Sequence, residues 1–174
     1  MTDRVKESLF NRLRSRDVLC GDALDLFAGT GTLGLESLSR GMDHCTFVER
    51  DRSALDFLRR NLHDLDLAAR ASVHRMDALS AAWADLLSAR PVRLVLCDPP
   101  YRLTEEASGM DRVATMIASL AAVVEPGGLL MLRTQRQTPV NPVSGWEGLQ
   151  CHLYGSMQLA FYQRGERPSA AQGS

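Results

Sequence analysis

The sequence of 174 residues lacks several features that would define its class. Its four cysteines, Cys20, Cys45, Cys97 and Cys151, lie far apart and form no CxxC pair, which favours buried free thiols in a reducing compartment. The four histidines show no metal-ligand spacing, so we predict no bound metal. No apolar run reaches the roughly 18 residues of a membrane span, and the polar N-terminus is unlike a signal peptide. These absences predict a protein of the reducing cytoplasm without a membrane part.

An excess of charge of one sign is also missing, since the formal net charge is −1 at pH 7. The total charge therefore gives no support for a nucleic-acid-binding protein. Residues 1–16 nevertheless hold five basic and two acidic side chains, which predicts either a solvated helix face or a basic patch beside a cleft. The length and the 45% hydrophobic content predict one domain over residues 1–164, a monomer by default, with a disordered polar tail over residues 165–174.

Apolar periodicity divides the chain into alternating helices and strands. Helices are expected over 3–15, with Thr2 as a possible cap, and over 32–40, 52–65, 78–88 and 105–124. Strands are expected over 23–27, 45–49, 71–75, 92–97, 129–133, 151–154 and 158–163. Pro126-Gly127-Gly128 predicts a firm break, residues 137–148 a loop, and Gly155-Ser156 a hairpin. The alternation predicts an α/β, Rossmann-like fold with a seven-stranded, mostly parallel sheet, a C-terminal antiparallel hairpin and helices on both faces.

Polar groups follow the expected strands at their carboxyl ends, where open α/β sheets bind ligands. After the first strand, Gly29-Thr30-Gly31-Thr32-Leu33-Gly34 fits G-x-G-x-x-G, a pattern that many tight turns also match. Glu49 ends the next strand 20 residues after Gly29, where an acid accepts the ribose hydroxyls of a nucleoside. Asp25, inside the first strand, would repel a pyrophosphate. The combination favours a ligand with a cationic group and no phosphate, such as the amino acid end of S-adenosyl-L-methionine.

Two further residues end the third expected strand. Asp77 could accept a hydrogen bond from an adenine amino group, and Met76 could pack against the adenine ring. Each also has an ordinary structural interpretation, as a helix cap for Asp77 and as a core residue for Met76.

The fourth strand ends in Asp98-Pro99-Pro100-Tyr101. The two prolines remove N–H donors and fix φ, so the loop is stiff. The Asp98 carboxylate and the Pro99 carbonyl could accept hydrogen bonds from an exocyclic amine, and the Tyr101 ring could stack on a flat base. Structural turns also use Asp-Pro, so the interpretation as a chemical site depends on the other strand ends.

The set Asp25-Leu26-Phe27-Ala28-Gly29-Thr30-Gly31, Glu49, Asp77 and Asp98-Pro99-Pro100-Tyr101 resembles class I S-adenosylmethionine-dependent methyltransferases that act on an exocyclic base nitrogen. More narrowly, residues 2–11, 34–40 and 154–162 resemble the bacterial 16S ribosomal RNA guanine-N2 methyltransferase family, and the whole resemblance covers residues 2–164. That family usually carries a further Gly- and Arg-rich N-terminal stretch, thought to help hold RNA, and this chain starts at the motif that follows it.

The resemblance implies direct methyl transfer to the base nitrogen, with ribosomal RNA or an assembling small ribosomal subunit as the partner. The implied catalytic residues are Asp98, Pro99 and Tyr101. The implied substrate contacts are Arg4, Lys6, Pro100 and Tyr101, and the first two could instead contact the cofactor carboxylate. The implied cofactor-binding residues are Asp25, Phe27, Ala28, Gly29, Thr30, Gly31, Gly34, Glu49, Arg50, Met76, Asp77, Ala78 and Asp98.

Four alternatives stay open. A DNA adenine-N6 or cytosine-N4 methyltransferase shares the Asp98 chemistry but normally needs a sequence-reading domain. A nicotinamide-dependent oxidoreductase is disfavoured by Asp25 and by the lack of a second catalytic domain. A non-catalytic RNA binder could keep the fold without activity. Protein glutamine methyltransferases carry Asn at the position of Asp98.

Overall fold

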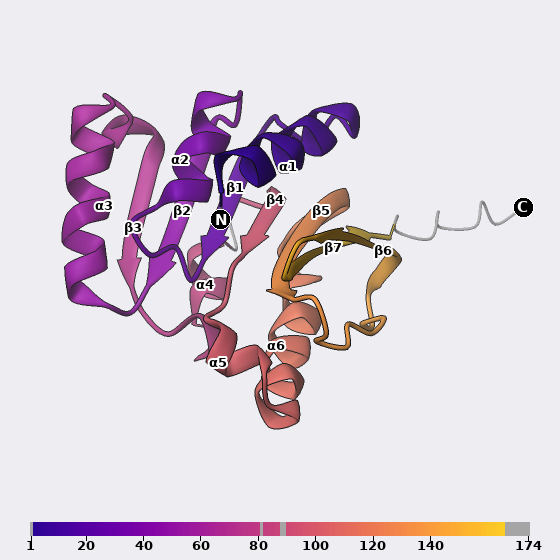
Figure 1. Ribbon diagram of the computed structural model, residues 1–174. Helices are drawn as coiled ribbons and strands as arrows, with labels where there is room; N and C mark the ends of the chain where they lie inside the picture. Colours follow the sequence, from indigo (N-terminus) through magenta and orange to yellow (C-terminus); the bar gives the residue numbers. More distant parts are fainter. Residues whose placement is uncertain (1, 81, 88–89, 166–174) are drawn as a thin grey trace, which may run out of the picture.

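The computed structural model describes residues 2–80, 82–87 and 90–165, and its centre is a seven-stranded sheet in the order β3-β2-β1-β4-β5-β7-β6 (Figure 1). The strands are β1 (Asp22–Leu26), β2 (His44–Glu49), β3 (Ala71–Arg75), β4 (Val92–Cys97), β5 (Val124–Gln135), β6 (Trp146–Tyr154) and β7 (Met157–Arg164). The first five strands pair in parallel, and β7 is antiparallel to both β5 and β6. The predicted Rossmann-like α/β fold with a closing antiparallel hairpin is confirmed.

The helices cover the two faces of the sheet separately. They are α1 (Asp3–Ser15), α2 (Thr32–Ser39), α3 (Arg52–Asp64), α4 (Trp83–Leu87), α5 (Tyr101–Thr104) and α6 (Ala107–Leu120), with short 3-10 turns η1 (Ala68–Arg70) and η2 (Ala78–Ser80). One core contains apolar side chains of α1, α2 and α3, and the other contains those of α4 and α6. Each core takes alternate residues of the central strands, because successive strand side chains point to opposite faces.

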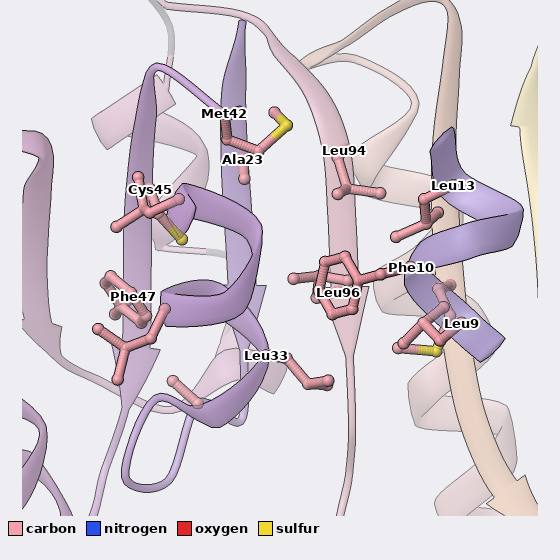
Figure 2. Close-up of a cluster of buried hydrophobic side chains, with 14 of the residues drawn as sticks. Leu9, Phe10, Leu13, Ala23, Leu33, Met42, Cys45, Phe47, Leu94 and Leu96 are labelled. Carbon is pink, nitrogen blue, oxygen red and sulfur yellow. The ribbon is translucent and has the colours of Figure 1, made fainter. Parts of the chain in front are cut away.

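Helix α1 shows how the sequence pattern produces this packing. Leu9, Phe10 and Leu13 recur on one side of the helix and are fully buried. Figure 2 shows them beside Leu94 and Leu96 of β4, which belong to the same core. The predicted helix over residues 3–15 is confirmed, and Thr2 precedes it without a side-chain capping bond.

The single helix predicted over residues 78–88 is wrong, because the chain forms η2 and then the short α4. In a continuous helix the Ala78 carbonyl would accept from the N–H of residue 82. Here it accepts from the indole N–H of Trp83 at 2.7 Å, and the N–H of Ala82 is directed to the Ser80 hydroxyl at 3.4 Å. The buried Trp83 side chain thus takes the place of a helical hydrogen bond, and the end predicted at residue 88 lies outside the described residues.

The helix predicted over residues 105–124 corresponds to the shorter α6, Ala107–Leu120, and the sequence did not predict the separate α5 that precedes it. Gly109 permits a close approach of the two, since a β-carbon there would lie 1.9 Å from the Leu103 carbonyl oxygen. The firm break predicted at Pro126-Gly127-Gly128 is wrong, because β5 continues through it. The pairing with β4 moves from Val92–Val124 to Leu94–Leu129, so the extra residues form an irregularity inside the strand.

The loop predicted over residues 137–148 is too long, because β6 begins at Trp146. The Trp146 indole N–H donates to the Ile117 carbonyl at 2.7 Å, and its ring packs edge-on against Tyr162. These tertiary contacts hold residues 146–148 in the sheet although Gly145 and Gly148 both have positive φ angles.

The prediction of buried thiols holds for Cys45 and Cys97 and is wrong for Cys20 and Cys151, which are exposed. Cys20 precedes β1 instead of lying within it, and Cys151 lies on the edge strand β6. None of the helices in the described ranges is long and apolar enough to span a membrane.

Candidate functional site

A cavity of about 680 Å³ lies at the carboxyl ends of the parallel strands, the edge where this fold class binds ligands. Its volume is in the range of small-molecule sites. The predicted site residues that line it are Phe27, Glu49, Arg50, Met76, Asp77, Ala78, Asp98, Pro99 and Pro100. They come from four strand ends, so the sheet topology brings together groups that are up to 73 residues apart in the sequence.

The Glu49 carboxylate joins the end of β2 to the glycine turn. One oxygen accepts from the Gly29 N–H at 2.9 Å, and the other accepts from the N–H groups of Arg50 and Asp51, both at 2.8 Å. A carboxylate offers about four acceptor positions, so one is left for a ligand hydroxyl. Backbone groups thus hold this side chain in a fixed position on the cavity wall.

The turn after β1 is strained as well as tight. Phe27, which lines the cavity, has a φ of 59°, a left-handed conformation that costs a non-glycine residue about 1–3 kcal/mol. The Ala28 N–H donates to the Val48 carbonyl at 3.1 Å, and the Gly31 N–H donates to the Ala28 carbonyl at 2.8 Å. Phe27 is the residue of this turn that lines the cavity. Five further predicted cofactor residues are absent from the lining formed by the described residues: Ala28, Gly29, Thr30, Gly31 and Gly34.

Asp25 is not on the cavity wall. It is only 1% exposed, and its Oδ2 accepts from the Gly34 N–H at 2.8 Å, which ties β1 to the start of α2. Burial raises the pKa of Asp25 to about 8, against the lowering effect of the Gly34 hydrogen bond. Burial therefore disfavours the charged form of Asp25, and the side chain is bonded to the backbone of α2 and does not line the cavity.

Asp77 and Met76 each make a structural contact and also line the cavity. Asp77 Oδ1 accepts from the Leu79 N–H at 3.0 Å, as a turn-capping residue does, and the side chain also lines the cavity. Met76 packs against the second core and lines the cavity too. A structural contact and a ligand contact are thus compatible at both positions.

Asp98 forms an ion pair that the sequence does not predict. Its backbone N–H approaches the Leu26 carbonyl at 3.4 Å, and its Oδ1 accepts from Nε of Arg133 near the carboxyl end of β5. The two side chains are 21% and 16% exposed. Burial raises the pKa of Asp98, and the Arg133 charge opposes that rise. A sequence signal for Arg133 existed, since it ends the strand predicted over residues 129–133 at the same edge of the sheet.

The ring of Tyr101, the first residue of α5, lies against Arg133, with 5.1 Å from Cζ to the ring centroid. Tyr101 is absent from the cavity wall formed by the described residues, and its stacking on a base stays a prediction. The same end of the cavity holds three charged residues that sequence reasoning also missed, Arg102, Glu106 and Arg112.

Lys6 and Arg4 of α1 do not reach the cavity wall formed by the described residues. Lys6 lies 3.7 Å from Glu36 and 3.5 Å from Asp3, so acidic groups neutralise its charge. Arg4 lines a separate shallow hollow of about 410 Å³ on α1, together with Arg12. Across the described ranges, no cluster of His, Cys, Asp and Glu side chains has the arrangement of a metal site.

Residues 1–163 match the family model described as "Conserved hypothetical protein 95". The chain is 46% identical over 163 residues to the Bacillus subtilis protein named "Putative rRNA methyltransferase YlbH", covering 94% of this chain and 86% of that protein. It is 29% identical over 168 residues to the Haemophilus influenzae "Ribosomal RNA small subunit methyltransferase D", covering 92% and 80%.

Solved structures agree with this relationship. The Escherichia coli structure described as "Putative methyltransferase yhhF" superposes with a TM-score of 0.77 at 30% identity, covering 96% of this chain and 88% of that chain. A Streptococcus pyogenes "conserved hypothetical protein" gives a TM-score of 0.75 at 25% identity, with 91% and 94% covered. The chain therefore belongs to the conserved hypothetical protein 95 family, the bacterial family of small-subunit ribosomal RNA methyltransferases that the sequence resembles.

Proposed function

We propose that this protein transfers a methyl group from S-adenosylmethionine to the exocyclic N2 amine of a guanine in small-subunit ribosomal RNA. The observation that carries the proposal is that one cavity contains both Glu49, suited to a nucleoside, and the Asp98-Pro99-Pro100 loop, suited to an amine. The names of the relatives, which refer to small-subunit ribosomal RNA, support the choice of nucleic acid. Residues 1–164 would form the single methyltransferase domain, acting as a monomer in the cytoplasm on RNA or on an assembling ribosomal particle.

The cavity residues fit S-adenosylmethionine. The acceptor position left on Glu49 suits a ribose hydroxyl, and Asp77 has a second oxygen for an adenine amino group. Phe27 and Met76 supply apolar wall for a flat ring. When bound, the cofactor supplies an electrophilic methyl group carried on a sulfonium.

The Asp98 loop would prepare the acceptor nitrogen. The lone pair of an exocyclic amine is delocalised into its ring, so hydrogen bonds from its N–H groups to Asp98 and to the Pro99 carbonyl would turn the lone pair toward the methyl group. The negative charge of Asp98 then stabilises positive charge that develops on the nitrogen. Asp98 would next accept the proton that the methylated amine loses. The base must leave its stack to reach this loop, which fits a target in RNA that can be extruded.

The two basic residues of α1 differ in whether a neighbouring acidic group pairs with them. Arg4 is exposed in the hollow on α1 and remains a candidate contact to RNA phosphates. Lys6 is paired with Glu36, so a contact to RNA would need that pair to separate.

The experiment that tests the function uses cofactor carrying a labelled methyl group. The protein is incubated in parallel with unmodified small-subunit RNA, assembling small-subunit particles and duplex DNA, and the modified base is then mapped. We expect label on guanine N2 in RNA or particles. Label on adenine or cytosine of the duplex would establish the DNA methyltransferase alternative. Cofactor binding without transfer to any of the three would favour the non-catalytic binder.

A further inference from the structure

We propose that Arg133 is a positioning residue of the methyl-acceptor site, which holds one oxygen of Asp98 and rests on the ring of Tyr101. In this arrangement the second oxygen of Asp98 is left for the acceptor amine. The inference rests on the proposed function, because it assumes that Asp98 receives that amine.

The sheet register places Arg133 beside Asp98. Leu132 of β5 is the pairing partner of Cys97 of β4. The residues that follow these two in the sequence, Arg133 and Asp98, form the ion pair. Arg133 Nε donates to Asp98 Oδ1, and the 16% exposed Arg133 side chain lines the cavity. Because Arg133 lies within β5 and Asp98 directly follows β4, the register of two paired strands brings the two side chains together.

Tyr101 supports the other side of the guanidinium. The 5.1 Å from Arg133 Cζ to the Tyr101 centroid is within the range of a cation–π contact. The α5 helix starts at Tyr101, directly after Pro100, whose φ of −61° is set by its ring. The Arg133 side chain of β5 therefore contacts both the first and the last residue of the Asp98-Pro99-Pro100-Tyr101 motif. Tyr101 is thus connected to the cavity through Arg133, although it does not line the cavity itself.

The positive charge of Arg133 also favours the ionised form of Asp98. Asp98 is largely buried, with buried Asp25 in the neighbouring β1, and burial favours its neutral form. Only an ionised Asp98 can oppose positive charge on the acceptor nitrogen, and an adjacent cation lowers a carboxyl pKa by about 1–3 units. The titratable and charged groups around Asp98 come from several elements. They are Asp25 of β1, Glu49 of β2, Asp77 before η2, Cys97 of β4, Arg133 of β5, Tyr101 and Arg102 of α5, Glu106 at the start of α6 and Arg112 within α6.

Lysine should replace arginine only in part. A lysine ammonium is a point charge, whereas the planar guanidinium donates through Nε and stacks on an aromatic ring at the same time. The structure uses both properties at Arg133. We therefore expect the Arg133→Lys variant to keep much of the effect on Asp98 ionisation. It should lose the fixed orientation that the Nε hydrogen bond and the Tyr101 contact give to Asp98.

The test compares the wild type with Arg133→Met, Arg133→Lys and the control Arg93→Met. Arg93 lies on β4 outside the cavity wall, and it also pairs with a carboxylate, Glu125, at 3.9 Å. Two quantities are measured. The first is the titration of the Asp98 carboxyl carbon by NMR in the free protein, assigned with Asp98→Asn. The second is the pH dependence of kcat and KM for methyl transfer to RNA.

In Arg133→Met we expect the Asp98 pKa to rise by about one unit or more, and the acid limb of the rate profile to move up with it. At pH 7, kcat should fall by about tenfold to 100-fold, with cofactor affinity within about twofold of wild type. Millimolar guanidinium chloride should restore part of the rate. Arg133→Lys should show a smaller pKa change, and Arg93→Met should show neither effect.

An unchanged Asp98 titration in Arg133→Met would overturn the inference, and so would a faster rate, which would mean that Arg133 blocks the amine. If the wild type transfers no methyl group to RNA, the proposed function fails. The NMR titration still decides the role of Arg133 in that case, because it needs no substrate.

Discussion

Three acidic side chains near the same edge of the sheet differ in what surrounds them. Glu49 is held by backbone N–H groups and lines the cavity, Asp98 is paired with Arg133, and Asp25 is enclosed with one backbone hydrogen bond. The same functional group is thus held in three different ways, by backbone N–H groups at Glu49, by an arginine at Asp98 and by full burial at Asp25. The environment of each residue, and not its type, determines which role it can take.

Glu49→Gln should weaken S-adenosylmethionine binding by about tenfold to 100-fold, because one amide oxygen cannot replace two carboxylate oxygens that accept three backbone hydrogen bonds. Titration calorimetry measures this directly. Glu147→Gln, an exposed glutamate of β6, serves as the matched control and should leave the affinity unchanged. Equal affinity for Glu49→Gln and wild type would refute the cofactor role of Glu49.

Asp25 should make the protein less stable as pH rises. Its pKa is about 8 in the folded state against 3.8 for an ordinary Asp, so unfolding releases a proton between these values. The free energy of unfolding should then fall with rising pH between about pH 4 and pH 8, by at most about 1.4 kcal/mol per pH unit from this group.

Denaturant unfolding of the wild type and of the Asp25→Asn variant across that pH range isolates the contribution of Asp25 to the free energy of unfolding. The variant should give the flatter dependence, with the two curves diverging as the pH increases. Parallel curves would mean that Asp25 is already ionised when folded.

Predicted site residues that do line the cavity, including Glu49, Asp77 and Asp98, lie at or just after the ends of strands. A strand end can be located from the apolar run before it. Arg133 was missed as a partner because its role depends on which strands are neighbours and on their register. Asp25 was expected to meet the ligand, but its side chain direction depends on the packing of α2, which the local sequence does not specify.

At the scale of elements, the junction between β1, the glycine turn and α2 is the least tolerant part of the site. A β-carbon on Gly34 would lie 2.2 Å from the Phe47 ring and 2.8 Å from Asp25 Oδ2. Neither neighbour can move freely, since Phe47 is fully buried and Asp25 is hydrogen-bonded to Gly34 itself. The glycine is therefore required for close packing of α2 against the sheet.

Gly34→Ala should destabilise the fold by about 1–3 kcal/mol through overpacking, measured by denaturant unfolding. Gly155→Ala is the control, because Gly155 has a positive φ of 56° and nothing within 4 Å of its added β-carbon. The control should show only the cost of the backbone conformation. A Gly34→Ala protein as stable as wild type would show that α2 can shift away from β2.

Helix and strand positions were predictable where amphipathic periodicity determined them, as in α1 and α3. They were not predictable where a distant side chain intervened. The Trp83 indole interrupts the helix expected over residues 78–88, and the Trp146 indole extends β6 into a glycine-containing segment. Both depend on tertiary hydrogen bonds that no local pattern encodes.

At the scale of the whole molecule, the strand order brings donor and acceptor groups to one edge of the sheet. Strands β1, β2 and β3 carry the groups suited to the nucleoside, and β4 and β5 carry Asp98 and Arg133. Two hydrophobic cores, one on each face of the sheet, pack these strands against the helices. A ligand that fills the cavity should therefore stabilise the entire domain.

S-adenosylmethionine at about 100 times its Kd should add about 2.7 kcal/mol of stability and raise the thermal midpoint by about 5–10 °C. Differential scanning calorimetry with and without the ligand measures the change. Glu49→Gln should show a much smaller rise at the same concentration. A nicotinamide dinucleotide should give none, and a rise with that compound instead would support the oxidoreductase alternative.

We predict that Asp98 acts mainly on the acceptor amine and contributes little to cofactor affinity, and the Asp98→Ala variant tests this role most directly. Methyl transfer to small-subunit RNA and cofactor affinity are measured on the same preparation, with wild type in parallel. We predict that transfer falls by at least about 100-fold while the cofactor Kd stays within about threefold of wild type. Turnover within about tenfold of wild type would contradict the account.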